Sequence, residues 1–471
     1  MIKYGILTLT LFLPGLHTIL AQPRGQVSVT LSGNIIDKDF GGPIPGAYVY
    51  IPDLKTGSVS DDHGDYQIKN LPPTRVLVQV SFIGYKDIIT SIDLSAVSQK
   101  DFVMEQAAIE MNEVIITGSS KSQELNNTPT PITIVPRLSL LQGSSTNIID
   151  AIATLPGLSQ VTTGPGISKP VIRGLGYNRI VVVHDGVRQE GQQWGDEHGI
   201  EIDEASVNKV EILKGPASLA YGSDALAGVI NMISSPTLPE GSIAGNLGFN
   251  YQSNNGLLGY SAGLGGNSGG FVWDAKYGGK IAHAYRNRYD GFVYNSGYRE
   301  NAARILLGLN KHWGYSHLTL GLYELTPGII EGERDSLTGK FIKTENPGDP
   351  FSWKTLADET DFLSYRPSVP FQKVGHYKAV LNSNLIIGQG NLKTIFCFQQ
   401  NRRQEFADAA SPDEYDQFFL MNSMHYDVQY NFPQKNFLDA AIGLNGMKQS
   451  SVNLGTEFLI PEYNLFDIGV F

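Results

Sequence analysis

The sequence predicts a mainly β protein with three parts: an N-terminal β-sandwich, a small α/β domain, and the first roughly nine strands of an incomplete transmembrane antiparallel β-barrel. Three observations support this fold class. From residue 243 onward, apolar and polar residues alternate in segments of about ten residues. The connections between these segments are alternately short and long. Only 17% of the 471 residues are charged, whereas 52 are Gly and 22 are Tyr, which suits strands, tight turns and interfacial aromatic side chains.

Charge and cysteine content exclude several classes of protein. The formal net charge is -11, so nucleic acid is not an expected partner, because phosphate binding requires a basic surface. The single cysteine, Cys397, excludes a disulfide framework and a cysteine-based zinc site, and its apolar neighbours predict an inert wall residue. There is no HExxH motif and no plausible cysteine nucleophile, so we do not expect an enzyme.

Residues 1–21 have the features of a secretory signal peptide. Lys3 precedes an apolar run at residues 6–13, and the small residue Ala21 marks the expected cleavage site. The apolar run is too short for a membrane-spanning helix, which needs about 20 residues. We therefore expect an exported protein that could enter a membrane only as a barrel.

Alternating runs and turn residues predict a β-sandwich of about seven strands over residues 22–105. This region resembles the carboxypeptidase regulatory-like domain, and the resemblance rests on the segments GNIID, PIPGAYVYI, GSVSDDHGDYQIKNLPP and VQVSFIGYKD in that order. Asp61, Asp62 and Asp65 could bind calcium, but Asp and Gly are also what a tight turn requires, and we prefer the turn.

Residues 106–140 are predicted to form a polar linker that contains one short run of high β-propensity. The run consists of Glu113, Val114, Ile115, Ile116 and Thr117. An exposed strand of this kind can pair with another protein, although it could also be a strand of the adjacent domain. The run resembles the TonB box of outer-membrane receptors. The resemblance implies pairing with the inner-membrane protein TonB, together with ExbB and ExbD.

Residues 141–236 are predicted to form the α/β domain, because short apolar runs are separated by Gly-rich turns. The region is similar to the plug domain of TonB-dependent receptors, since several motifs of that family occur in order at residues 147–157, 172–174, 183–187, 210–216, 221–222 and 228–231. Three charged residues in these motifs are candidates for ion pairs between the plug and the barrel wall, or alternatively solvated charges: Arg173, Glu211 and Lys214.

Residues 237–471 are predicted to form the barrel wall. Short connections lie near 265–269, 311–315, 387–390 and 432–436, and long ones near 280–302, 326–373 and 403–420. Outer-membrane barrels have short periplasmic turns and long external loops, so the plug would enter from the side of the short turns. The family closes at about 22 strands. We therefore interpret the chain as a fragment or a truncated gene product, with residues 464–469 as a loop or the start of a strand.

A polar cluster between Gly191 and Gly199 is the predicted ligand-binding apex of the plug. Its carboxylates and imidazole suit transition-metal ligation, for which Asp196 and His198 are the candidates. The alternative is a solvated apex with a packed indole. The external loops supply further candidates, of which Arg286 and Arg288 favour an anionic ligand. The predicted apex residues are Gln192, Gln193, Trp194, Asp196, Glu197 and His198.

These resemblances together imply a TonB-dependent receptor in the outer membrane, with its N-terminal domains in the periplasm. Its expected function is active uptake of a metal chelate, namely a ferric siderophore, haem, cobalamin or zinc. No intrinsic cofactor is expected, because the metal ion or chelate would be cargo, and membrane lipid would surround the wall. The alternatives are a SusC-like importer of glycans or peptides and, in another class, a secreted β-rich adhesin.

Overall fold

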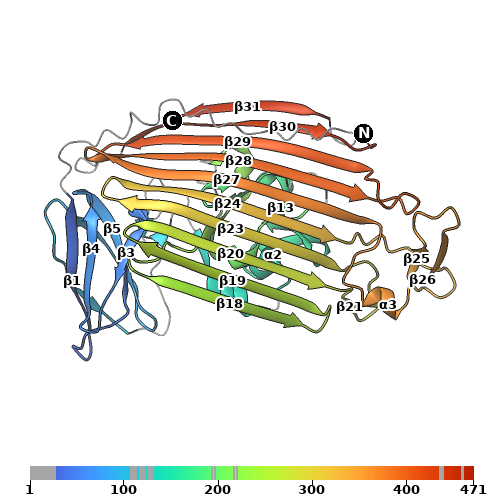
Figure 1. Ribbon diagram of the computed structural model, residues 1–471, viewed down its shortest axis with the longest axis horizontal. Coiled ribbons are helices and arrows are strands. Elements are labelled where there is room, and N and C mark those ends of the chain that lie inside the picture. Colours follow the sequence, from blue (N-terminus) through green and yellow to red (C-terminus); the bar gives the residue numbers. More distant parts are fainter. Residues whose placement is uncertain are drawn as a thin grey trace.

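The computed structural model describes residues 28–106, 114–115, 123–124, 132–143, 145–191, 195, 198–215, 218, 221–433, 440–457 and 461–471. The predicted signal peptide, residues 1–21, lies outside this part of the chain. Figure 1 shows a sandwich against one end of a large curved sheet, whose strands run side by side, and a smaller domain that packs against that sheet. The three predicted parts are therefore present.

The N-terminal part is a sandwich of two sheets, with strand orders β4-β1-β7 and β3-β2-β5-β6. Leu31, Val49 and Val78 alternate with half-buried positions and are fully buried in its core. The Oδ1 of Asp61 accepts hydrogen bonds from the backbone N–H groups of residues 63 and 65, which confirms a turn at this point. The strands are β1 (Val29–Asp37), β2 (Tyr48–Ile51), β3 (Thr56–Val59), β4 (Asp65–Leu71), β5 (Arg75–Ser81), β6 (Ile88–Asp93) and β7 (Phe102–Met104), with the 3-10 helix η1 (Pro52–Leu54) after β2.

The plug contains a mixed sheet of order β10-β16-β17-β14-β15 and a three-stranded sheet of order β11-β12-β13. The side chain of Asn147 begins helix α2 by accepting hydrogen bonds from the N–H groups of Ile149 and Asp150. The elements are β10 (Ile132–Pro136), α1 (Arg137–Gln142), α2 (Ile148–Ile152), β11 (Leu158–Gly164), β12 (Ile167–Ile172), β13 (Leu175–Gly176), η3 (Tyr177–Arg179), β14 (Ile180–His184), β15 (Val187–Arg188), η4 (Glu204–Ser206), β16 (Val207–Leu213), η6 (Ser223–Ala225) and β17 (Gly228–Ser234).

The wall is one antiparallel sheet of ten strands in which each strand pairs with the next along the chain. Residues 463–470, expected as a loop or strand start, form the tenth strand, because all eight pair with the preceding strand. The strands are β18 (Ile243–Gln252), β19 (Leu257–Ser268), β20 (Phe271–Ala282), β23 (Tyr298–Lys311), β24 (Gly314–Pro327), β27 (Phe371–Ile387), β28 (Gly390–Phe406), β29 (Gln417–Asn431), β30 (Ala441–Asn453) and β31 (Tyr463–Val470).

The wall has an apolar outer face and a polar inner face. Along β23, Ile305, Leu307 and Leu309 are exposed on the outside, whereas Arg304 points inward and is 8% exposed. The same alternation produced the sequence signal, because outward residues of a membrane barrel contact lipid. Among the described residues, no helix has the length and apolar character needed to cross a membrane.

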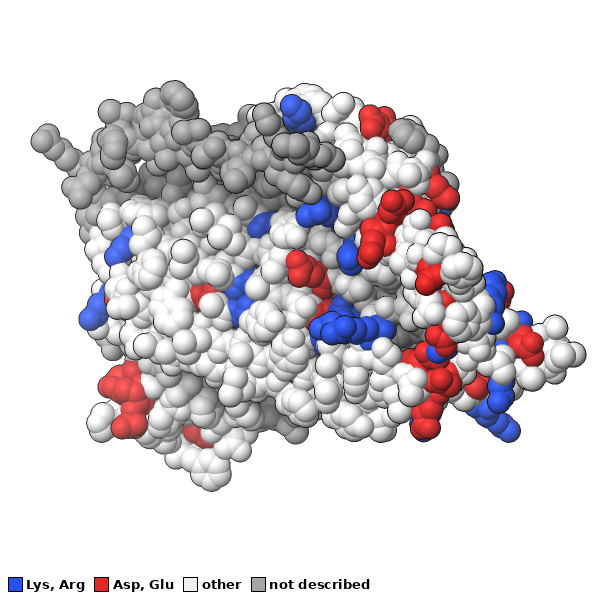
Figure 2. Space-filling view, turned by 45° about the vertical axis from the view of Figure 1, so that its right-hand side comes forward, with Lys and Arg blue, Asp and Glu red and all other residues white. Residues whose placement is uncertain are grey.

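The two ends of the wall differ in their connections. Tight turns join β19 to β20, β23 to β24 and β27 to β28, whereas long loops at the other end carry β21 (Arg286–Asn287), β22 (Gly291–Phe292), β25 (Ile342–Glu345), β26 (Trp353–Leu356) and α3 (Glu359–Phe362). Figure 1 places the sandwich at the end with the short turns. Figure 2 shows acidic and basic side chains gathered at the end with the long loops. These placements agree with the predicted orientation.

Candidate functional site at the interface of plug and wall

The predicted ligand-binding apex is represented by one residue. Gln192, Gln193, Trp194, Asp196 and Glu197 lie outside the described residues. His198 is 5% exposed, and its backbone N–H donates to the carbonyl of Gly195. Burial, together with the charges of Arg403 and Lys169, lowers the pKa of His198, so its imidazole is neutral at physiological pH. A neutral imidazole can ligate a metal, but His198 is enclosed in this state, and the metal site stays a prediction.

A buried polar cluster fastens the plug to the wall beside His198; we call it the upper cluster, comprising Glu201 of the plug and His376, Asn401 and Arg403 of the wall. Arg403 Nη2 lies 2.7 Å from Glu201 Oε1, and His376 Nδ1 lies 3.1 Å from Oε2. Asn401 Nδ2 donates to Oε2 at 2.5 Å. All four side chains are at most 5% exposed.

The electrostatics of the upper cluster keep Glu201 ionised. Burial alone would raise the pKa of Glu201, but the hydrogen bond from His376 and the charge of Arg403 lower it overall. Arg403 also donates through Nη1 to Gln372 Oε1 at 2.9 Å, so its guanidinium is held in place from two sides. The cluster is therefore a paired buried charge, which is costly to break on one side only.

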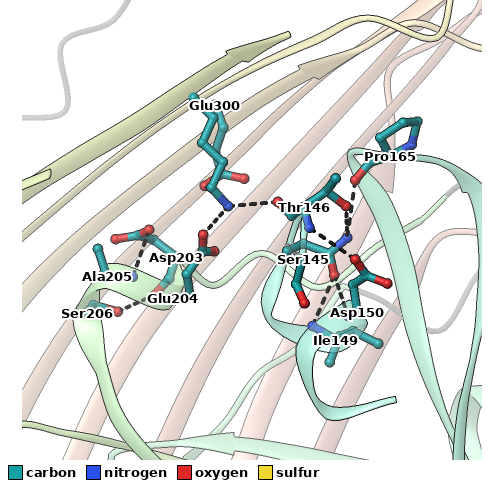
Figure 3. A network of polar contacts seen from close by, with 12 residues as sticks. Ser145, Thr146, Ile149, Asp150, Pro165, Asp203, Glu204, Ala205, Ser206 and Glu300 are labelled. Carbon is teal, nitrogen blue, oxygen red and sulfur yellow. Dashed lines mark hydrogen bonds and ion pairs between the residues drawn. The ribbon is translucent and has the colours of Figure 1, made fainter. Parts of the chain in front are cut away.

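A second group, the Lys280 cluster, comprises Asp203 and Glu204 of the plug with Lys280 and Glu300 of the wall (Figure 3). The three carboxylates lie within 4.8 Å of one another, which is close enough for a metal ion. The ammonium of Lys280, however, pairs with Glu204, lies 3.8 Å from Glu300 and donates to the carbonyl of Thr146 at 2.9 Å. The cation that this cluster holds is therefore the lysine itself.

A third contact lies about halfway along the strands. Arg304 forms ion pairs with Asp185 of the plug at 3.2 Å and with Asp274 of its own sheet at 3.0 Å. Lys276 Nζ donates to Ser235 Oγ at 3.1 Å, and Lys378 Nζ donates to the carbonyl of His184 at 3.2 Å. All of these plug residues lie at or just beyond the carboxyl ends of the parallel strands β14 and β17.

The strand register places these wall cations side by side. Lys276 pairs with Arg304, Arg304 with Gly321, and Gly321 with Lys378 on successive strands. Since directly paired residues project to the same face of a sheet, the three cations form one row across the inner wall. We call Lys276, Arg304 and Lys378 the cation row.

The four plug–wall ion pairs described above share one polarity, because the plug supplies the carboxylate and the wall supplies the cation or imidazole. Close backbone approach supports them: Gly191 has a φ of +105°, and a Cβ there would lie 2.8 Å from the side chain of Asn401. None of the wall partners was singled out from the sequence. A buried charge within an alternating strand, such as Arg403, is the signal that could have found them.

Arg173, Glu211 and Lys214, the residues predicted to pair with the wall, have contacts within the plug. Glu211 is fully buried and pairs with Lys209 of the same strand at 2.8 Å. Lys214 Nζ donates to the carbonyl of Pro156 at 3.0 Å, and the backbone N–H of Arg173 donates to the carbonyl of Gly157. Burial and the charge of Arg173 lower the pKa of Lys214. A role of these residues in plug–wall pairing stays a prediction.

The predicted TonB box is partly described. Val114 and Ile115 form the short strand β8 (Val114–Ile115), which pairs antiparallel with β9 (Gln123–Glu124). Glu113, Ile116 and Thr117 lie outside the described residues. A two-residue ladder is far shorter than a typical strand. Because residues 114–115 already pair as a strand, their backbone has the extended conformation that pairing with another protein requires.

Comparison with known families identifies two regions of the chain. Residues 31–116 match the family model of the CarboxypepD_reg-like domain, and residues 124–229 match that of the TonB-dependent Receptor Plug Domain. The second match covers the domain that packs against the inner face of the membrane-type wall. Residues 124–229 are therefore a plug domain of the TonB-dependent receptor type. A curated relative is the iron-regulated outer membrane virulence protein of Vibrio cholerae, which is 32% identical over 127 residues, or 26% of this chain and 19% of that protein.

Solved structures share the fold of this receptor. A variant of the ferric enterobactin receptor PfeA from Pseudomonas aeruginosa has a TM-score of 0.52 at 13% identity, covering 72% of this chain and 51% of that chain. The pyoverdine receptor FpvA from the same organism, bound to pyoverdine, has a TM-score of 0.51 at 16% identity, covering 72% and 48%. The receptor thus spans about half the length of these structures.

The family comprises receptors and transporters rather than enzymes. Two strings in the sequence have the GxSxG pattern of hydrolases, residues 259–263 and 266–270. Both lie in β19 and the tight turn that follows it. Hydrolases instead require this pattern at a sharp turn between a strand and a helix, so neither string is a catalytic motif.

Proposed function

We propose that the receptor mediates TonB-dependent uptake of a metal chelate through the outer membrane, with TonB pairing to residues 113–117. The observation that carries this proposal is the polar plug–wall interface, in which Glu201, Glu204 and Asp185 pair with wall residues. When the plug moves, the charged and polar groups of this interface can form hydrogen bonds with water instead, whereas the side chains of an apolar core have no such replacement. The similar proteins named above, an iron-regulated outer membrane protein and receptors for ferric enterobactin and pyoverdine, support a chelate as cargo.

The cation row supports a cargo with negative charge. In the resting state the plug covers Lys276, Arg304 and Lys378 with Asp185 and with neutral oxygen acceptors. A plug that shifts away from the wall leaves these cations facing the passage, where a carboxylate-, phenolate- or phosphate-bearing chelate can replace the lost contacts. Anionic ferric chelates fit this chemistry better than a free zinc ion does.

The experiment compares the full-length receptor with a form that lacks residues 112–118. Cells expressing either form are given labelled ferric siderophore, haem, cobalamin, zinc or oligosaccharide, and binding in de-energised cells is separated from energised uptake. We expect the deletion to preserve binding and abolish uptake of one metal chelate. A deletion that leaves all properties unchanged would favour an adhesin. Uptake of the oligosaccharide alone would instead favour a SusC-like importer and contradict the proposed ligand class.

A further inference from the structure

The polar contacts between the N-terminal sandwich and the wall strands are concentrated in one tight turn, residues 52–56, which we call the docking turn. Beside it, Ile386 of the wall packs against the sandwich core. The 3-10 helix η1 ends at Lys55, whose φ of 49° lies in the left-handed region and whose N–H donates to the carbonyl of Pro52. This conformation reverses the chain between β2 and β3. It leaves the carbonyl oxygens of Asp53 and Lys55 available to other parts of the protein.

Lys55 makes the larger share of the contacts. Its carbonyl oxygen accepts hydrogen bonds from Thr237 Oγ1 and from Asn310 Nδ2, both at 2.5 Å. Its ammonium lies 4.8 Å from the centre of the Tyr315 ring, within the range of a cation–π contact. Lys55 of the sandwich is thus held by Thr237, in the segment between β17 of the plug and β18 of the wall, and by the wall strands β23 and β24.

Asp53 and Tyr48 extend the same interface. The carbonyl oxygen of Asp53 accepts from Asn384 Nδ2 at 2.7 Å, and its carboxylate lies 3.6 Å from Lys393 Nζ. Tyr48 donates through its hydroxyl to the carbonyl of Thr237 at 3.0 Å. The interface therefore spans β23, β24, β27 and β28, four successive strands of the wall.

All of these wall residues lie at the end with the short turns. Asn310 is next to the last residue of β23, and Tyr315 is the second residue of β24. Asn384 lies near the end of β27 and Lys393 near the start of β28. In a TonB-dependent receptor this end faces the periplasm. Figure 1 shows the sandwich across these strand ends.

A cavity of about 1400 Å³ lies between the sandwich, the plug and the wall. The sandwich lines it with Tyr50 and Lys55, the plug with Asp185 and Ser234, and the wall with Arg304 and Lys378. The cavity is therefore lined by the whole cation row on one side and by the docking turn on another. A cargo that passes along the row toward the periplasm meets the sandwich.

We propose that the N-terminal sandwich is a periplasmic cap, which docks on the wall through the docking turn and has to lift before cargo can leave the cavity between plug and wall. The docked position is independent of the cargo, whereas the capping role rests on the transport proposed above. The contacts suit reversible docking, since they comprise hydrogen bonds to carbonyl groups, one cation–π contact, one partly exposed ion pair and a single half-buried apolar side chain of the wall, Ile386.

The linkers on the two sides of the predicted TonB-binding run differ in length. Six residues, 107–112, separate the sandwich from the predicted TonB-binding run, and fourteen, 118–131, separate that run from β10. Fully extended, these segments span about 20 Å and about 50 Å. The connection from residues 113–117 to the cap is therefore shorter along the chain than the connection to the plug.

The docked position is tested by pulsed EPR on the full-length receptor in nanodiscs, with Cys397→Ser and spin labels at Asp62→Cys and Gln389→Cys, both exposed positions. We expect one narrow distance distribution. Asp53→Lys places like charges together at Lys393 and should broaden it, and the exchange Asp53→Lys with Lys393→Asp should restore it. Asp39→Lys makes the same charge change at an exposed position of the sandwich and should have no effect. A distribution that is broad without substitution, or insensitive to Asp53→Lys, would overturn the docked position.

The capping role is tested with Asn208→Cys, at a position that lines the cavity, as the single cysteine in Cys397→Ser receptors that carry Asp53→Lys, Asp39→Lys or neither substitution. A charged thiol reagent is added from the periplasmic side, and its reaction rate is measured. We expect Asp53→Lys to accelerate labelling about fivefold, the effect of one surface ion pair, and Asp39→Lys to leave it unchanged. Labelling that stays constant while the EPR distribution broadens would overturn the cap, leaving both the docked position and the transport proposal in place.

Discussion

Replacing Glu201 by Gln tests whether the upper cluster fastens the plug to the wall. The substitution preserves the shape of the side chain and removes its charge. Arg403, which is 2% exposed and 2.7 Å from the carboxylate, would then stay buried without its counter-charge. The new Gln side chain can keep some of the hydrogen bonds to His376 and Asn401. The main change is therefore the loss of the negative charge next to Arg403.

The expected loss is large because the pair is desolvated. Removing one partner of a buried ion pair costs about 3–5 kcal/mol, and we take the lower end because Gln keeps one acceptor oxygen. About 3 kcal/mol corresponds to an increase on the order of 100-fold in the population with the plug detached. Because the pKa of Glu201 is lowered in the folded state, its contribution is present above its usual value of 4.5 and is lost only as pH falls below it. The effect should therefore be the same at pH 6 and pH 8.

Cys397 reports plug detachment without further engineering. Its side chain is 5% exposed and packs with Val187 of the plug in a small apolar cluster. We expect Glu201→Gln to accelerate its reaction with a thiol reagent on the order of 100-fold. Glu240→Gln, at an exposed position in the chain segment that connects β17 to β18, should leave the reaction rate of Cys397 unchanged. Equal rates for the two variants would refute the assignment of the upper cluster as a fastening point.

Three further predictions follow from the other contacts. Burial and the charge of Glu204 raise the pKa of Asp203 to about 6, although Lys280 opposes this shift. Plug docking should therefore weaken as pH rises through 6, because the carboxyl group then becomes charged. The substitution Asp203→Asn should raise the thermal unfolding midpoint at pH 7.5 and change it little at pH 4. Lys276→Gln with Lys378→Gln should lower uptake of an anionic ferric chelate roughly tenfold in cells, with unchanged binding in de-energised cells. Asn147→Ala should destabilise the plug by about 1–2 kcal/mol, measurable by thermal unfolding, since it caps α2.

The wall could be predicted because its signal is local. In a strand with lipid on one side and a polar interior on the other, neighbouring residues such as Arg304 and Ile305 differ in polarity by necessity. The tenth strand was only partly predicted, with residues 464–469 interpreted as a loop or the start of a strand, for the complementary reason. Asn464 and Asp467 make residues 463–470 look like a loop, and only the backbone ladder to β30 makes them a strand.

The interface could not be predicted, because its partners are far apart along the chain. Glu201 and Arg403 are separated by 202 positions, and no local pattern connects them. Family motifs drew attention to Glu211 instead, but that residue is buried inside the plug against Lys209. A motif reports which residues the domain needs for its own fold as readily as which residues contact another domain.

The plug carboxylates that pair with the wall all belong to one continuous stretch, residues 185–204, between β14 and β16. Among the described residues of this stretch, Val187, Ile200 and Ile202 enter apolar clusters, and Val187 joins a cluster of the wall rather than that of the plug. Ile200 and Ile202 connect the stretch to the main plug core, at about 1.5–3 kcal/mol each. The pairing of β15 with β14 and the ion pair between Arg188 and Asp224 hold it to the plug as well. The wall therefore holds the plug through a peripheral stretch with few apolar contacts, and releasing this stretch from the wall requires breaking ion pairs and hydrogen bonds rather than separating an apolar core.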